Sequence, residues 1–255
     1  MKKLAAVTAI TFLAVGAASA ADMRAAPLPS RAPAPVAVVT YNWTGCYIGA
    51  GGGYGMYDQE TQYLVDGFPT GVAVDNGGRG WFGTVQVGCD YQFGNFVIGA
   101  FGDYDFADIS GVMSTGALGL VGQETLSSSW AAGGRLGYLP FQSQQLLVFV
   151  SGGYTQSRFD AVGFTTNFGV PVDAALSEHT YSGWFLGSGY EYQLGWFPGL
   201  TWKTEYRFAD LSADVVPVTG TAVTLASLEN RKYVQTIRSA LVWRFNFGGP
   251  VVARY

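Results

Sequence analysis

The sequence predicts an all-β protein, an eight-stranded antiparallel up-and-down transmembrane β-barrel, and three observations support this prediction. The segment from Tyr233 to Phe247 alternates with a two-residue period, which is typical of a β-strand with two chemically distinct faces. The composition is 49% hydrophobic and only 13% charged, whereas soluble domains carry roughly 25% charged residues. Candidate strands are separated by connections that alternate between short and long, as in membrane barrels.

The first twenty residues predict a secretory signal peptide. Two lysines precede an apolar run from Leu4 to about Ala17, and Ala18-Ser19-Ala20 follows as a small-residue cleavage site. The alternative is an uncleaved anchor helix, but the run is shorter than the roughly 20 apolar residues of a membrane-spanning helix. We therefore expect residues 1–20 to be removed and the Pro/Ala-rich residues 21–41 to form an extended periplasmic leader.

Residues 42–247 are predicted to form the barrel and residues 248–255 a C-terminal tail. Short connections suit tight periplasmic turns and long ones suit outside loops, whereas a soluble sandwich has no reason to place every long loop at one end. The predicted strands are 43–57, 79–93, 96–106, 128–139, 146–157, 179–193, 200–211 and 232–247. The short connections are 93–95, 140–145 and 194–199, and the long ones are 58–78, 107–127, 158–178 and 212–231.

Most of the predicted strands carry polar or charged side chains on one face and apolar side chains on the other. In the strand 200–211, Lys203 and Glu205 share one face, and Trp202 and Tyr206 share the opposite one. An ionised side chain that faces acyl chains costs several kcal/mol near the midplane, so we expect the charged faces to enclose a narrow lumen plugged by ion pairs. The residues of this predicted lumen charge network are Asp90, Asp103, Asp105, Arg135, Glu191, Lys203, Glu205, Arg207, Arg238 and Arg244.

Tyrosine and tryptophan residues collect near the ends of the predicted strands. Amphipathic rings at headgroup depth form the interfacial girdles of membrane barrels. Ordinary strand propensity explains the abundance of aromatic residues but not their position at strand ends. The predicted girdle residues are Trp43, Trp81, Tyr91, Trp130, Tyr138, Tyr192, Trp202 and Trp243.

The two cysteines of the sequence, Cys46 and Cys89, predict a disulfide because the chain is exported. If the first two strands form an antiparallel hairpin that pairs Tyr57 with Arg79, Cys46 lies almost opposite Cys89. Opposed residues lie about 4.5–5.5 Å apart, which is compatible with a bridge near the periplasmic rim. The alternative is a pair of buried free thiols.

The segment Tyr41–Gly49 reads YNWTGCYIG and resembles the opening motif W-[ST]-G-[aromatic]-Y-[VI]-G of small alphaproteobacterial outer-membrane barrels. These are the immunogenic, opacity-type surface proteins, which are related to the transmembrane domain of the OmpA class. Further matches are GCDYQ at 88–92, EYRF at 205–208 and VQTIR at 234–238, so the resemblance covers most of residues 41–255.

This resemblance implies an eight-stranded barrel in the outer membrane of a Gram-negative bacterium, with an envelope-structural or porin-like role and surface-exposed, antigenic loops. Cys46 departs from the motif, where the family has an aromatic residue. The barrel-assembly machinery is expected to read a terminal aromatic residue, and Phe247 and Tyr255 both qualify for that signal.

The sequence gives little support for catalysis or for nucleic-acid binding. A net charge of -4 provides no basic patch that could neutralise phosphates, so no nucleic-acid partner is expected. The single histidine, His179, lies beside Ser177 and Glu178 and suggests a hydrolase as an alternative, but such a loop–strand junction is commonly polar. We therefore predict no enzyme and no catalytic residues. One histidine and two distant cysteines make no ligand cluster, and no metal or cofactor is expected.

Two classes of function fit these observations. The first is an integral outer-membrane barrel with an envelope-structural and surface role and a largely plugged lumen, of which a narrow porin-like solute channel is a variant. Its expected partners are outer-membrane lipid, lipopolysaccharide and, during insertion, the barrel-assembly machinery, and it is expected to be a monomer or weak oligomer. The second class is a soluble secreted lipocalin-like binding barrel, which requires the aromatic faces to point inward and the charged faces outward.

Overall fold

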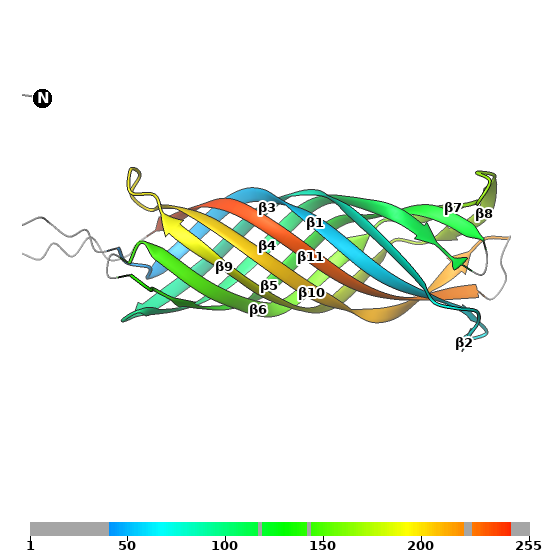
Figure 1. Ribbon diagram of the computed structural model, residues 1–255, viewed down its shortest axis with the longest axis horizontal. Helices are drawn as coiled ribbons and strands as arrows, with labels where there is room; N and C mark the ends of the chain where they lie inside the picture. The colour runs from blue at the N-terminus through cyan, green and yellow to red at the C-terminus, as the bar shows by residue number, and fades with distance from the viewer. Residues whose placement is uncertain (1–40, 117–118, 142–143, 222–225, 246–255) are drawn as a thin grey trace, which may run out of the picture. The chain divides into compact units, whose positions relative to one another are not determined.

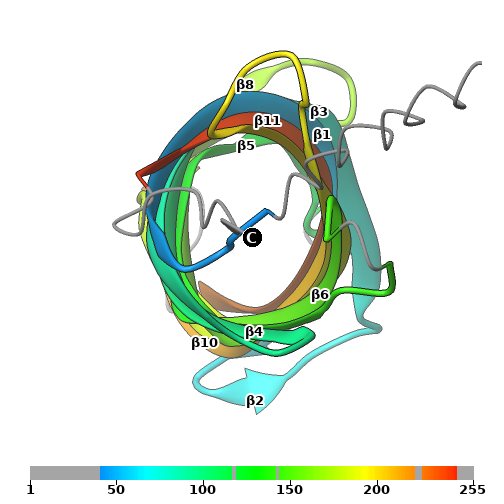
Figure 2. The same cartoon turned by 90° about the vertical axis from the view of Figure 1, so that its left-hand side faces the viewer.

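The computed structural model describes residues 41–116, 119–141, 144–221 and 226–245, which form an antiparallel β-barrel (Figures 1 and 2). They belong to the second of two units of the chain, Val38–Tyr255. The predicted signal peptide, nearly all of the predicted leader and the predicted tail lie outside the described residues. In these described residues no helix is long and apolar enough to cross a membrane. The strands are β1 (Gly45–Val65), β2 (Phe68–Pro69), β3 (Val74–Phe93), β4 (Phe96–Ser114), β5 (Leu120–Tyr138), β6 (Leu146–Phe159), β7 (Val162–Thr166), β8 (Pro171–Leu176), β9 (His179–Gln193), β10 (Leu200–Thr219) and β11 (Ala226–Phe245).

Eight of these strands close a ring, which Figure 2 shows along its axis. β1 pairs with β11 on one side and with β3 on the other, and the ring continues through β4, β5, β6, β9 and β10 back to β11. Every pairing in the ring is antiparallel. A closed ring has no unpaired edge, so all of its backbone groups can be satisfied in lipid. The predicted eight-stranded up-and-down barrel is confirmed.

The short connections, which were predicted to be periplasmic, have the predicted positions, but the strands extend further than predicted at the other end. β1 ends at Val65 instead of residue 57, and β10 ends at Thr219 instead of residue 211. The predicted loops 58–78, 107–127 and 212–231 therefore shorten to 66–73, which contains β2, and to 115–119 and 220–225.

The predicted loop 158–178 contains a hairpin, β7–β8, that continues the barrel wall beyond β6 and β9. β7 pairs with β5, with Val121 opposite Thr165, and β8 pairs with β10, with Val218 opposite Leu176. The hairpin lies at the same end of the barrel as β2 (Figure 1). The outer part of the molecule is thus mostly ordered sheet.

The predicted strand ends coincide with interruptions of the strand register. Register shifts follow Phe106 in β4, precede Ser128 in β5 and follow Leu211 in β10, and β6 ends at Phe159. An extra residue at such a shift moves the following side chains of that strand to the opposite face. The two-residue period is broken at these positions, which explains why the period alone made β4, β5 and β10 too short. The register of β1 with β3 and β11 is uninterrupted, so the shifts do not account for the predicted end of β1 at residue 57.

The orientation of the side chains agrees with a membrane barrel and contradicts the lipocalin-like alternative. On β10, Trp202 and Tyr206 point outward and are 49% and 46% exposed, whereas Lys203 and Glu205 are 2% and 0% exposed. A soluble barrel would show the reverse, with its apolar side chains in the core and its charges in water.

Two girdles of aromatic side chains surround the barrel. On β3, Trp81 belongs to the outer girdle and Tyr91 to the inner one, and both are exposed. Ten residues of a strand tilted by about 40° span roughly 25 Å, which matches the apolar band of outer-membrane barrels. Contacts between neighbouring rings in these girdles include Tyr54–Trp81, Trp130–Tyr154, Trp184–Phe208, Tyr91–Phe93, Phe96–Tyr138 and Phe197–Trp243.

Candidate functional site

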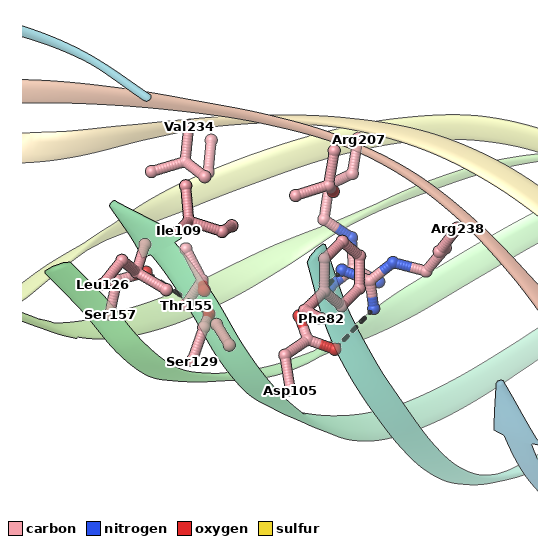
Figure 3. Close-up of a pocket in the computed structure, with 13 residues that line it drawn as sticks. Phe82, Asp105, Ile109, Leu126, Ser129, Thr155, Ser157, Arg207, Val234 and Arg238 are labelled. Carbon is pink, nitrogen blue, oxygen red and sulfur yellow. Dashed lines mark hydrogen bonds and ion pairs between the residues drawn. The ribbon is translucent and has the colours of Figure 1, made fainter. Parts of the chain in front are cut away.

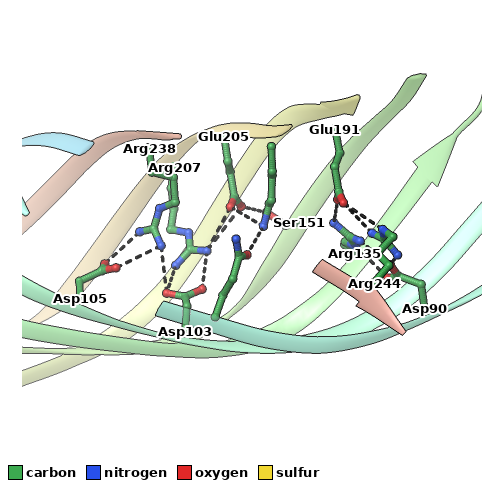
Figure 4. Close-up of polar contacts among 12 residues, drawn as sticks. Asp90, Asp103, Asp105, Arg135, Ser151, Glu191, Glu205, Arg207, Arg238 and Arg244 are labelled. Carbon is green, nitrogen blue, oxygen red and sulfur yellow. Dashed lines mark hydrogen bonds and ion pairs between the residues drawn. The ribbon is translucent and has the colours of Figure 1, made fainter. Parts of the chain in front are cut away.

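The lumen between the two girdles holds all ten residues of the predicted charge network (Figure 4). Each of them is buried, with at most 8% of its surface exposed, and each makes at least one ion pair. They project from six of the eight ring strands, because inward-facing positions alternate along every strand of a barrel. The ion pairs divide into two neighbouring clusters.

The inner cluster lies toward the end with the short connections and joins two acids to two arginines. Arg135 of β5 pairs with Asp90 of β3 and, at 2.9 Å, with Glu191 of β9. Arg244 of β11 contacts the same two carboxylates, Asp90 at 2.7 Å and Glu191 at 2.8 Å. Each carboxylate thus receives both arginines, and the cluster is electrically neutral. The Thr201 hydroxyl also donates to Glu191 Oε1 at 2.6 Å.

The middle cluster lies further outward and contains three acids and three bases, so it is neutral as well. Arg207 of β10 donates both of its terminal nitrogens to Asp103 of β4, at 3.0 and 2.8 Å. Arg238 of β11 bridges Asp103 and Asp105, each at 3.0 Å. This forked geometry is the strongest that arginine and carboxylate form.

Lys203 and Glu205 complete the middle cluster. Lys203 Nζ lies 3.2 Å from Glu205 Oε2 and donates to the Gln86 side-chain oxygen at 2.9 Å. Glu205 Oε1 accepts a hydrogen bond from the Ser151 hydroxyl at 2.6 Å. The partners come from β3, β6 and β10, so this cluster ties opposite walls of the barrel across the lumen.

A further buried ion pair, which the sequence did not predict, joins Glu124 and Lys232. Lys232 Nζ donates to Glu124 Oε1 at 2.7 Å and lies over the rings of Phe159 and Tyr181, at 4.1 and 4.9 Å from their centroids. Glu124 was missed because it falls in the range predicted as a loop. Lys232 lies on the same even-numbered face as the arginines of the last strand, and that pattern could have identified it.

A small cavity separates the middle cluster from the apolar outer part of the lumen (Figure 3). Arg207, Arg238 and Asp105 line it on one side, and Ile109 and Leu126 line it on the other. Water centres can occupy about 20 Å³ of it, which is room for about one water molecule. Further outward, buried side chains fill the lumen, among them Met113, Leu120, Phe164, Leu176, Val216 and Leu228.

Trp43 lies inside the mouth of the barrel at the end with the short connections, which corrects its predicted place in a girdle. Its side chain is fully buried, its indole N–H donates to the Gln144 carbonyl at 2.9 Å, and the Arg244 guanidinium lies 4.6 Å from its ring. Trp43 precedes the first strand, so the two-residue period does not govern its direction. The start of the described chain crosses the mouth of the ring in Figure 2.

Cys46 and Cys89 form a disulfide between β1 and β3. The two strands pair Tyr57 with Gly78, one residue away from the predicted partner Arg79, so that the cysteines lie directly opposite each other. Both are on the outward side of the wall, near the rim with the short connections. The structure therefore contains no pair of free thiols among the described residues.

The residues considered for hydrolysis make other contacts. His179 Nε2 lies 2.8 Å from Asp214 Oδ2, and Glu178 pairs with Arg158. No hydrogen bond joins Ser177 to His179 in the part of the chain that the structure describes. In the same part, no three His, Cys, Asp or Glu side chains are arranged to hold a metal ion.

Outward aromatic girdles, a closed ring of strands and a charged interior together define a small integral β-barrel of the bacterial outer membrane. Two curated relatives, from Brucella melitensis biotype 1 and Brucella suis biovar 1, are each named 31 kDa outer-membrane immunogenic protein. Each is 31% identical to this chain over 229 residues, which cover 84% of the chain and 88% of the relative. The chain belongs to this family of outer-membrane immunogenic proteins, which confirms the resemblance seen in the sequence.

No protein-family model matches the sequence. Among solved structures, the outer-membrane protein OprG from Pseudomonas aeruginosa is similar with a TM-score of 0.52, at 11% identity, over 80% of this chain and 98% of that one. This likeness supports the fold alone. The fold and the family together place the protein in the outer membrane of a Gram-negative bacterium.

Proposed function

We propose that the protein has a structural and surface role in the outer membrane, and that its lumen does not conduct solutes. The observation that carries this proposal is the closure of the lumen at three levels. Trp43 fills the periplasmic mouth, and the two neutral ionic clusters cross the membrane zone. Apolar side chains and the buried Glu124–Lys232 pair fill the outer zone. The cavity between the last two levels has room for about one water molecule.

Conductance in planar bilayers tests the closed lumen. We expect the purified, refolded protein to give no stable openings at moderate voltage, and we expect liposomes that contain it to resist swelling in small sugars. Detergent without protein is the blank, and heat-modified mobility in gels verifies that the barrel is folded. Large and stable open channels would overturn the proposal and favour the narrow porin-like channel instead.

We also propose that the end formed by β2 and the β7–β8 hairpin faces the cell exterior. Its tips expose large apolar side chains, with Phe68 75% and Phe168 94% exposed, as expected of surface loops that antibodies reach. The name of the Brucella relatives, an immunogenic protein, supports this orientation. An epitope tag inserted after Gly169 should be labelled on intact cells, whereas a tag after Gly94 in a periplasmic turn should be labelled only after permeabilisation. The reverse pattern would contradict the orientation.

The remaining expectations about partners belong to the same proposal. The outward apolar belt supports contact with phospholipid and lipopolysaccharide, and the barrel fold supports the proposal that the barrel-assembly machinery inserts the protein. We further propose a non-enzymatic protein that acts as a monomer or weak oligomer. Chemical cross-linking in native membranes tests this, because a dominant cross-linked oligomer would contradict it.

A further inference from the structure

An apolar groove follows the membrane-facing side of β6 near the periplasmic rim. The strand registers place Val148 of β6 directly between Tyr138 of β5 and Tyr190 of β9. All three side chains point outward, and each tyrosine is 47% exposed. Neighbouring strands are about 4.8 Å apart, so the two tyrosines stand roughly 10 Å apart with a short valine between them. The groove is therefore one strand wide.

The floor of the groove continues outward along β6. Val150 is the next outward-facing position, between Leu136 and Ser188. Beyond it the Leu186 side chain lies close to Gly152, so the floor consists of Val148 and Val150, whose Cα atoms are about 7 Å apart. Phe96 and Leu146 also line the groove.

We propose that this groove binds one acyl chain of a phospholipid of the periplasmic leaflet, with the hydroxyls of Tyr138 and Tyr190 at the level of its headgroup. The groove is continuous with the lipid-facing belt, so lipid is the molecule that reaches it. Its inner end lies at the inner girdle, where β5 ends at Tyr138 and β9 ends at Gln193. The occupant therefore enters from the periplasmic leaflet, where tyrosine rings lie at headgroup depth.

The shape of the groove favours a single chain over a second copy of the barrel. A barrel wall is convex and several strands wide, and it would rest on the two tyrosine ridges without touching the valine floor. An extended acyl chain fits between ridges about 10 Å apart and contacts Val148 and Val150 along its length. In lipid, such contacts stabilise through van der Waals packing, because the hydrophobic effect does not distinguish one apolar neighbour from another.

Native mass spectrometry of the refolded protein in detergent, with phosphatidylethanolamine added, tests this proposal. We expect one lipid to be retained by the wild-type protein, and roughly fivefold less retention by Val150→Phe, which fills the floor. Tyr190→Phe removes a hydroxyl, and the loss of one hydrogen bond also corresponds to roughly fivefold. Val87→Phe is the matched control, since Val87 is a lipid-facing valine on β3, 56% exposed and outside the groove.

The control should retain lipid as the wild type does, and heat-modified mobility should show that all variants are folded. Equal retention by Val150→Phe and Val87→Phe would overturn the groove as the binding site. Retention of lipid A with no retention of phosphatidylethanolamine would overturn the assignment to the periplasmic leaflet. Neither result depends on whether the lumen conducts, so the proposal stands apart from the closed lumen.

Discussion

Replacing Glu191 with glutamine tests whether the ionic clusters stabilise the barrel. Glu191 is fully buried and accepts from Arg135, Arg244 and Thr201. In the Glu191→Gln variant, the two arginines share only Asp90, so the inner cluster carries one uncompensated positive charge. Removing one partner of a buried ion pair typically costs about 3–5 kcal/mol, and we expect a loss of that size in the free energy of unfolding. Urea titration in phospholipid vesicles, followed by tryptophan fluorescence, measures it.

A second substitution separates charge imbalance from a general defect. In Glu191→Gln/Arg244→Gln, Asp90 and Arg135 remain as a neutral pair, so the double variant should be less destabilised than the sum of the single variants by about 2 kcal/mol. Arg158→Gln is the control, because Arg158 and Glu178 form an exposed pair that water and salt screen, so its loss should leave the free energy of unfolding close to that of the wild type. If Glu191→Gln lowers the free energy of unfolding no more than that control does, the ionic clusters do not stabilise the fold. If the effects of the two single substitutions simply add, charge imbalance is not the cause of the loss.

Substitutions at three further sites probe other parts of the barrel. Trp43→Ala should lower the free energy of unfolding by about 3–5 kcal/mol and produce small-ion leakage in planar bilayers, and an unchanged leak would show that Trp43 does not close the mouth. Cys46→Ser with Cys89→Ser should cost about 2–4 kcal/mol in urea titrations, with no change in heat-modified mobility, and an equal midpoint with and without the bridge would contradict this. Glu124→Gln alone should be destabilising, whereas Glu124→Leu with Lys232→Met should be close to neutral, and the same loss in both would refute the pairing as the cause.

The membrane zone could be predicted from the sequence because one rule governs it. With lipid outside, every charge within the bilayer must face the lumen, so the alternation of Lys203, Glu205 and Arg207 with aromatic residues specified both faces of β10. Pairing of these charges across the lumen could not be read from sequence. Arg207 reaches Asp103 from a strand more than a hundred residues away, and which acid it selects depends on barrel closure and strand stagger.

Trp43 and Glu124 were misplaced for two different physical reasons. Trp43 precedes β1, where the chain bends into the mouth of the barrel and strand periodicity has no meaning. Glu124 lies beyond the register shift at Ser128, where an extra residue exchanges the two faces of β5. A search for shifted periods on both sides of each interruption would have extended the strands and brought Glu124 to the inside.

The same interruptions coincide with a change in the force that stabilises the wall. Between the girdles both environments of the wall are unusual, since lipid lies outside and ion pairs lie inside, and burial of apolar surface contributes little there. Beyond the outer girdle, the outward residues include Asp58, Glu60 and Asp75, while Leu126, Phe159 and Leu228 are packed inside. That zone has the polarity of a soluble barrel, because its outer surface meets water and the hydrophobic effect again favours an apolar interior.

One strand can serve both zones only if its inward side chains change from charged to apolar along its length, and β10 does so between Arg207 and Leu211 before its register shifts. Substituting Leu211 with lysine should therefore be as damaging as in a soluble core, although a lysine only eight residues earlier, Lys203, is part of the stable structure.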